Sequence, residues 1–301
     1  MPLMHLPESV HVPVLLREVL EFLNPQEGKI YVDGTLGGGG HTEALCRCGA
    51  KVIAFDRDSE ALNRTEQRLR SLFDTSPFPI RFAHANYRYF AEALDMLEIG
   101  KIDGFLLDLG LSSDQLADSG RGFSFDSDGA LDMRFDPSEG LPAYEWLEIQ
   151  SEESLANTIY LYGEERRSRR IVRRIVEARE TGQPIHTARQ LAELVRQCVP
   201  KSRKHPIDPA TRTFQALRIA VNDELGSLQA VLAQLPKRIQ PGGVAVVISF
   251  HSLEDRIVKN AFRENPSWKI MTPKPITASE EEIARNPRSR SAKLRAAKRE
   301  Q

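Results

Sequence analysis

Three short apolar segments of the chain each end on an aspartate, and this pattern constrains the fold more than any other feature. The segments cover residues 30–33, 51–56 and 102–108, and a helix-like period over 57–72 separates the second from a further strand-like segment at 80–83. Strands that alternate with helices at this spacing are typical of βαβ units and a parallel sheet. Segment 102–108 is almost continuously apolar, as expected of a strand covered on both faces. The sequence therefore predicts a mostly parallel, doubly wound α/β sheet.

A different pattern interrupts these βαβ units. Residues 110–142 are rich in Gly, Ser, Asp and Pro and show no sustained period, whereas 151–199 reads as helical throughout. Within it, Thr187 and Gln190 have the spacing of a capping box at a helix start. One long amphipathic helix is then expected from Phe214 to Leu235.

The α/β pattern resumes at a buried strand over 244–249, with a helix opening near Leu253 beside an N-cap at Ser252. The simplest organisation is one discontinuous domain, residues 1–112 and 206–301, with an all-helical insertion at 113–205. No internal repeat is present.

Composition excludes several classes of protein. Hydrophobic residues make up 41% and charged residues 28% of the 301-residue chain, which is ordinary for a folded globular protein. The longest apolar run, 244–250, is far shorter than the roughly 20 residues that span a bilayer, and no signal peptide is recognisable. Three cysteines, Cys46, Cys48 and Cys198, are too few for a disulfide framework and lack zinc-site spacing. We expect a cytoplasmic protein without membrane or metal.

The near-neutral net charge of −1 hides an uneven distribution. Six arginines crowd residues 166–174, and a second basic block lies at 285–299. Each block alone could be a solvated helix face or tail. Together, in a chain of almost no net charge, they favour a polyanionic partner such as nucleic acid.

The glycine-rich turn after the first strand limits the choice of ligand. It reads Asp33-Gly34-Thr35-Leu36-Gly37-Gly38-Gly39-Gly40-His41. Turns at this place in open parallel sheets bind ligands. A P-loop would need Lys-Ser/Thr after the last glycine, and a dinucleotide fingerprint fits the spacing poorly. The pattern of Asp33, Gly37 and Gly39 is instead typical of S-adenosylmethionine sites; a merely tight turn is the structural alternative.

Four further residues extend this candidate site. Asp56 ends the second strand, where a carboxylate can accept both hydroxyls of a ribose, although enzymes that bind NAD place an acid similarly. Tyr87 follows the third strand and could pack on an adenine or simply belong to the core. Asp108 ends the fourth strand, and Gln115, seven residues on, could reach the same crevice.

The chain resembles the bacterial 16S rRNA cytosine-N(4) methyltransferases of the RsmH (MraW) type, almost from end to end. The motifs that carry the resemblance are His11-Val12-Pro13-Val14-Leu15-Leu16, the glycine-rich turn, Asp108-Leu109-Gly110-Leu111-Ser112-Ser113, Arg121-Gly122-Phe123-Ser124-Phe125, Tyr162-Gly163-Glu164-Glu165-Arg166, Thr211-Arg212-Thr213-Phe214-Gln215 and Ser249-Phe250-His251-Ser252-Leu253-Glu254.

The resemblance implies methyl transfer from S-adenosylmethionine to the exocyclic amine of a decoding-region cytidine, position 1402 of 16S rRNA. The rRNA is expected to be bound as part of the small ribosomal subunit. The resemblance also implies a Rossmann-like methyltransferase sheet, with the insertion recognising RNA. By motif, the cofactor residues are Gly39, Gly40, His41, Asp56, Tyr87, Asp108 and Gln115. A homodimer is left open.

Cytosine's 4-amino group is a poor nucleophile, so the chain should supply alignment and hydrogen-bond acceptors rather than a metal or a covalent nucleophile. Asp108 is the first candidate acceptor, unless it binds the cofactor. Ser112, Ser113 and His251 are the others, and His251 could equally be a helix-opening residue.

We expect five arginines to bind RNA phosphates: Arg166, Arg169, Arg170, Arg212 and Arg218. The rival hypotheses are a methyltransferase of another RNA, of protein or of a small molecule, and a non-catalytic RNA-binding module of the same fold.

Overall fold

The computed structural model describes residues 12–73, 75–112, 115–116, 118–200 and 207–300. The chain divides into two compact units. The first, an α/β unit, comprises residues 1–112 and 226–301, and the second, a helical unit, comprises residues 113–225. No described helix combines the length and the apolar content needed to cross a bilayer.

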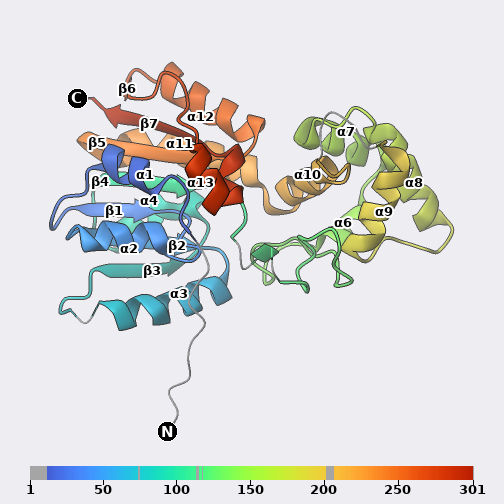
Figure 1. Cartoon of the computed structure of the whole chain (residues 1–301), viewed down its shortest axis with the longest axis horizontal. Coiled ribbons are helices and arrows are strands. Elements are labelled where there is room, and N and C mark those ends of the chain that lie inside the picture. Colours follow the sequence, from blue (N-terminus) through green and yellow to red (C-terminus); the bar gives the residue numbers. More distant parts are fainter. Residues whose placement is uncertain (1–11, 74, 113–114, 117, 201–206, 301) are drawn as a thin grey trace, which may run out of the picture. The chain divides into compact units, whose positions relative to one another are not determined.

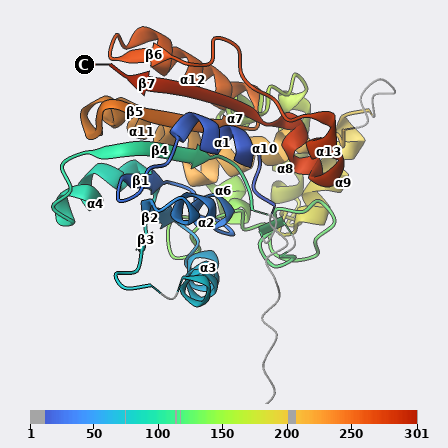
Figure 2. The same cartoon turned by 60° about the vertical axis from the view of Figure 1, so that its left-hand side comes forward.

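A seven-stranded sheet in the order β3-β2-β1-β4-β5-β7-β6 forms the α/β unit (Figures 1 and 2). Five strands are parallel, and β7 runs antiparallel to both its neighbours. This confirms the mostly parallel sheet expected from the sequence. The strands are β1 (Ile30–Asp33), β2 (Lys51–Asp56), β3 (Ile80–His84), β4 (Ile102–Asp108), β5 (Ile239–Ser249), β6 (Trp268–Ile270) and β7 (Lys293–Arg299).

Helices cover both faces of this sheet, so it is doubly wound as predicted. On one face, buried residues of α1 (Leu16–Leu23), α2 (Gly40–Arg47) and α3 (Ser59–Leu72) pack on the strands. The other face is covered by α4 (Phe90–Met96), α11 (Glu224–Arg238) and α12 (Ser252–Glu264). Alternate residues of β4 and β5 enter the two cores, which is why these strands read as nearly continuous apolar runs.

One predicted element is wrong, and two strands were not predicted. The helix expected from Phe214 to Leu235 is two helices, α10 (Thr211–Asn222) and α11, because Asp223 between them is left-handed with φ 47°. Residues 293–299 of the basic block form strand β7 in the sheet, so this part of the block is not a solvated tail, the alternative that the sequence left open. Sequence analysis missed both β6 and β7, because their alternation is obscured by lysines and arginines.

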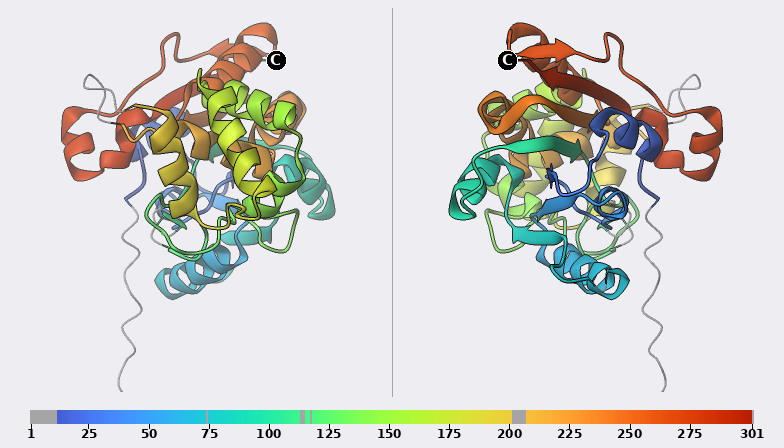
Figure 3. Two further views of the ribbon diagram at one scale, coloured as in Figure 1. Left: turned by 90° about the vertical axis from the view of Figure 1, so that its right-hand side faces the viewer. Right: turned by 90° about the vertical axis from the view of Figure 1, so that its left-hand side faces the viewer.

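The helical unit contains α6 (Ala143–Ile149), α7 (Glu152–Gly163), α8 (Ser168–Glu180), α9 (Ala188–Cys198) and α10 (Figure 3). The capping box at Thr187 and Gln190 is confirmed. The helical unit ends later in the chain than the predicted insertion: it extends to residue 225, whereas the prediction ended it at 205. The reason is that α10 packs along α7, a long-range pairing that helical periodicity does not reveal.

The contact of α7 with α10 requires glycine at position 163. A Cβ there would lie 2.4 Å from the carbonyl oxygen of Arg212 and 3.3 Å from Cβ of Ala216. Alanine normally stabilises a helix relative to glycine. Here the added methyl group would force the two helices apart.

We therefore expect Gly163→Ala to lower the free energy of unfolding by about 1–3 kcal/mol, as overpacking does. Denaturant unfolding followed by circular dichroism measures this. Gly100→Ala is the control, because a Cβ at Gly100 meets nothing within 4 Å; equal stability of the two variants would contradict the packing argument.

Candidate active site

Asp33 organises the loop that joins β1 to α2. Its carboxylate accepts hydrogen bonds from the backbone N–H of Thr35 at 3.1 Å and from the hydroxyl of Thr42 at 2.7 Å. The side chain is 1% exposed, and burial raises the pKa of Asp33 to about 6 despite these hydrogen bonds. Asp33 therefore fixes the conformation of the loop through these hydrogen bonds. Its contacts with the described residues give it a structural role rather than a direct contact with a ligand.

The glycines of this loop are fixed from two sides. The N–H of Gly37 donates to Oδ2 of Asp56 at 2.8 Å, and the hydroxyl of Thr65 on α3 donates to the Gly37 carbonyl at 2.6 Å. Gly39 has φ 75°, and a Cβ on it would lie 2.5 Å from Cγ2 of Thr65. Only glycine both adopts this positive φ readily and leaves room for the Thr65 side chain. The loop thus presents bare backbone at the start of α2.

Asp56 lies at the end of β2, as predicted, and joins the loop to the next helix. Its Oδ1 accepts the N–H of Asp58 at 2.9 Å, which leaves each carboxylate oxygen with capacity for a further hydrogen bond. Burial raises the pKa of Asp56 to about 6. A carboxylate held in this way can accept two hydroxyl groups of a ligand.

His41 and Asp108 face one another at the ends of α2 and β4. Nε2 of His41 lies 3.0 Å from the carbonyl oxygen of Val14, and because a carbonyl only accepts, Nε2 carries the proton. Nδ1 is therefore an acceptor, and it lies 3.7 Å from Oδ2 of Asp108. Burial lowers the pKa of His41 to about 4, so the imidazole is neutral at pH 7.

The other oxygen of Asp108 makes this residue unusual. Oδ1 is buried and has no hydrogen-bond partner among the described residues. Burial, and then the nearby charge of Asp33, raises the pKa of Asp108 to about 8, against the lowering effect of Arg288. A buried polar atom without a partner costs free energy. Asp108 is therefore prepared to accept a donor, or a positive charge, that a ligand brings.

Two more predicted residues lie at the same loop. Cβ of Ser112 is 4.0 Å from the point where a Cβ on Gly37 would sit, and Cβ of Tyr87 is 3.1 Å from the corresponding point on Gly34. Tyr87 begins the short 3-10 helix η1 (Tyr87–Tyr89) and is only partly buried. Ser113 lies outside the described residues, and Gln115 belongs to the helical unit.

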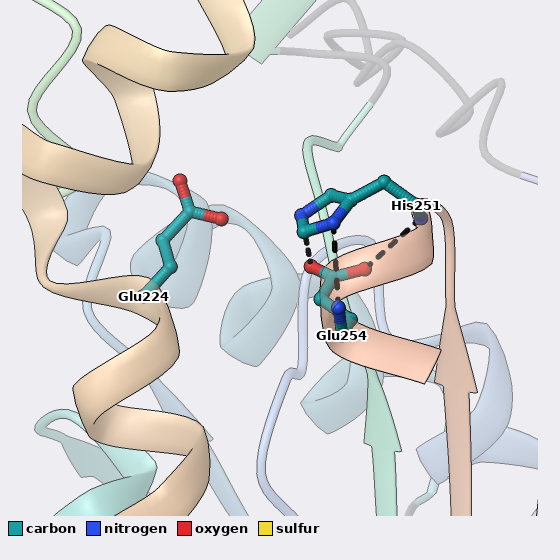
Figure 4. A group of neighbouring side chains, drawn as sticks. All are labelled: Glu224, His251 and Glu254. Carbon is teal, nitrogen blue, oxygen red and sulfur yellow. Dashed lines mark hydrogen bonds and ion pairs between the residues drawn. The ribbon is translucent and has the colours of Figure 1, made fainter. Parts of the chain in front are cut away.

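His251 serves as a helix cap. It is the N-cap of α12, a position that the sequence assigned to Ser252, and it forms a capping box with Glu254. Figure 4 shows the two side chains together: Nδ1 of His251 accepts the N–H of Glu254 at 3.4 Å, and Nε2 lies 3.2 Å from Oε1 of Glu254. The side chain is 9% exposed. The helix-opening alternative therefore has direct structural support.

Sequence analysis missed how the N-terminal segment 12–15 is held. The side chain of Asn286 donates to the carbonyl of Val12 at 3.0 Å, and the N–H of Leu15 donates to Oε1 of Glu282 on α13 (Glu280–Arg285) at 2.8 Å. Pro13 lies against Gly40, where a Cβ would be 3.0 Å from its ring. Because Val14 then binds His41, the later segment fixes the wall of the site. No pattern in the sequence indicated that residues 282 and 286 contact this segment.

The predicted RNA-binding arginines lie in the helical unit, and one differs from the rest. Arg166, Arg169 and Arg170 are exposed, and no ion pair of the described residues involves them. Ile171, Val172 and Ile175 of α8 are buried. Arg169 and Arg170 therefore occupy the outer side of this helix, and Arg166 lies just before its start. Arg212 is exposed as well.

Arg218 does not fit the predicted role. Its guanidinium binds both carboxylate oxygens of Glu224, at 2.7 and 2.9 Å, and the side chain is 14% exposed. Its charge is therefore compensated within the protein, which sequence spacing alone could not reveal.

The sheet order, the glycine loop after β1 and the acidic ends of β2 and β4 define a methyltransferase of the Rossmann-like class. A family model described as the MraW methylase family matches residues 8–300, and the chain belongs to this family. It is 51% identical over 303 residues to the ribosomal RNA small subunit methyltransferase H of Rhodopirellula baltica, covering 97% of this chain and 92% of that protein. The protein of the same name from Sorangium cellulosum is 49% identical, over 98% and 95% of the two chains.

The raised pKa of Asp108 makes stability depend on pH. The unfolded chain ionises this group near its ordinary pKa of 3.8, whereas the folded chain keeps the proton up to about 8. The unfolded state therefore binds fewer protons, and the free energy of unfolding falls as the pH rises between these values.

Asp108→Asn removes this dependence, so we expect the variant to become more stable than the parent by a growing margin from pH 4 to pH 8, reaching a few kcal/mol. Thermal unfolding across this range measures the effect. Glu98→Gln is the control, because that side chain is exposed and no ion pair of the described residues involves it. A margin that stays constant with pH would refute the assignment.

Proposed function

We propose that this chain transfers a methyl group from S-adenosylmethionine to the N(4) amine of a decoding-region cytidine in 16S rRNA, in the cytoplasm. The observation that carries the proposal is Oδ1 of Asp108, which is buried and has no hydrogen-bond partner among the described residues. It lies in a member of a methylase family, at the sheet edge that also carries the glycine loop and Asp56. The names of the relatives support small-subunit rRNA as the substrate.

The residues at the loop fit the cofactor. Asp56 has acceptor capacity for the two ribose hydroxyls, and the half-buried ring of Tyr87 can cover an adenine. Gly39 is the N-cap of α2, and Gly40 and His41 are its first residues. We assign their backbone to the cofactor on the family resemblance. We assign Gln115 to the same cofactor on the family resemblance alone.

When bound, S-adenosylmethionine supplies a methyl group activated by a sulfonium. The chain's own task is then to hold the acceptor amine in line and to stabilise it as it loses a proton. Asp108 is the residue equipped for this, because Oδ1 can accept an N–H of the amine and Oδ2 faces the acceptor nitrogen of His41.

The charge state of Asp108 matters for this role. As a neutral acid it is a poor acceptor, and a nearby cation lowers its pKa, which makes the carboxylate available when the sulfonium is present. Ser112 is close enough to the loop to help orient the amine, whereas His251 acts by capping α12 beside this edge of the sheet.

The helical unit is proposed to bind the RNA through α8. Arg166, Arg169 and Arg170 offer uncompensated positive charge, which phosphates attract without regard to sequence. Arg212 belongs to this group, and Arg218 does not. The domain boundary of the RNA-binding insertion is accordingly proposed at 113–225.

Incubation with the methyl-labelled cofactor and naked 16S rRNA, immature subunits or mature small subunits tests the function. Nucleoside analysis should give N(4)-methylcytidine or its 2′-O-methylated form. Label in another nucleoside would indicate a different RNA reaction, and cofactor binding without turnover on any substrate would indicate a non-catalytic module.

Arg169→Ala with Arg170→Ala should raise the KM for the methylated RNA about tenfold and leave kcat unchanged, because phosphate contacts bind ground state and transition state alike. The control, Lys51→Ala with Arg81→Ala, removes the same charge from exposed positions of the α/β unit. An unchanged KM in the first variant would favour a protein or small-molecule substrate.

A further inference from the structure

A second group of positive charges lies in the α/β unit, over α12 and the edge strand β6. Lys259, Arg263, Lys269 and Lys274, here called the α12–β6 cluster, are at least partly exposed, and no ion pair of the described residues involves them. Between positions 256 and 274 the only acidic residue is Glu264. The cluster is therefore a local excess of positive charge that the protein does not neutralise itself.

A pocket of about 280 Å³ opens within this cluster. Its lining includes the apolar side chains of Phe262, Ile270 and Pro273, with Lys259 and Arg263 beside them. Ile270 is 38% exposed although it is large and apolar. Apolar lining with flanking cations is the arrangement that suits a planar ring carrying a phosphate.

A third cation of the pocket lining, Arg295, already forms an ion pair within the protein. Arg295 binds Asp255, with Nε 2.6 Å from Oδ1, and Lys293 lies 3.8 Å from the same carboxylate. These contacts fix the pocket wall and leave Lys259 and Arg263 as its available charges. The pocket is thus built on a rigid base, with its free charge on the outer helix.

Nothing in methyl transfer uses this pocket. In the sheet order, β5 and β7 separate β6 from β4, which carries Asp108. At about 4.8 Å per strand, this places the edge strand roughly 14 Å across the sheet from the reacting groups. The separation is short compared with the extent of an RNA substrate, so one bound RNA could reach both places.

We propose that this pocket binds an unpaired nucleotide of the substrate RNA, with its base on the apolar lining and neighbouring phosphates on the α12–β6 cluster. The proposal rests on the proposed function, whose substrate it describes more closely. Two features favour RNA over an acidic peptide. The positive charges continue along α12 and β6 beyond the pocket, where neighbouring phosphates of a strand would lie. The cavity also has room for one planar ring rather than for several consecutive side chains of a peptide.

The charge part of the proposal is tested by Lys259→Ala with Arg263→Ala. We expect the KM for the rRNA substrate to rise about tenfold at unchanged kcat, and the slope of log KM against log salt to become shallower by about 1.4, the value for two lost single-strand phosphate contacts. Lys51→Ala with Lys101→Ala is the matched control, since both are exposed lysines of the same unit.

The pocket itself is tested by Ile270→Trp, which fills the cavity without changing charge. A base-binding pocket predicts a higher KM with the wild-type salt slope. Met96→Trp is the control, because Met96 is 85% exposed on α4, away from the pocket lining. Thermal unfolding shows whether each variant is folded.

The outcomes separate the two proposals. If the wild-type chain methylates no rRNA, the proposed function fails first. If it does so while both test variants behave like their controls, the pocket does not bind the substrate. A change of oligomeric state in Ile270→Trp, measured by light scattering, together with an unchanged KM would identify the surface as a contact between copies and overturn the proposal.

Discussion

The hydrogen bond from the Gly37 N–H to the Asp56 carboxylate ties the ends of two neighbouring strands together, and the geometry of the site depends on it. The same carboxylate binds the N–H of Asp58, which in turn caps α3. Thr65 of that helix then returns a hydrogen bond to the Gly37 carbonyl. Loop, strand end and helix therefore form one closed network, in which no member can move without breaking a bond of another.

The network has an electrostatic cost. Asp33, Asp56 and Asp108 lie buried at one edge of the sheet, and the pKa of each is raised. A protein selected only for stability would not gather three carboxylic acids where burial disfavours their charge. Such an arrangement is typical of ligand-binding sites, in which the ligand provides the hydrogen-bond donors and the positive charge that the carboxylates lack in the free protein.

Much of this could be predicted from the sequence, because the relevant signals are local. The strands ending at the three aspartates and the capping box at Thr187 follow from short-range patterns. The rest depends on contacts between distant residues. The helix break at Asp223, the pairing of Arg218 with Glu224 and the edge strands β6 and β7 are settled by tertiary packing.

The candidate site divides in the same way. Motif spacing placed Asp56, Asp108 and the glycines at one sheet edge, which the geometry bears out. It could not show that Oδ1 of Asp108 has no hydrogen-bond partner in the described part of the chain, nor that His251 rather than Ser252 caps α12. Those are properties of side-chain orientation, which a pattern of residue types does not encode.

The attachment of segment 12–15 by Glu282 and Asn286 has a consequence for how the protein matures. The hydrogen bond of Leu15 with Glu282 spans 267 positions of the chain, and that of Val12 with Asn286 spans 274. During synthesis strands β1 to β4 and the glycine loop emerge first, but the wall that carries Val14 gains its support only after a much later segment has emerged. A nascent chain would therefore leave Val14, and with it the partner of His41, without this support until residues 282 and 286 have been synthesised.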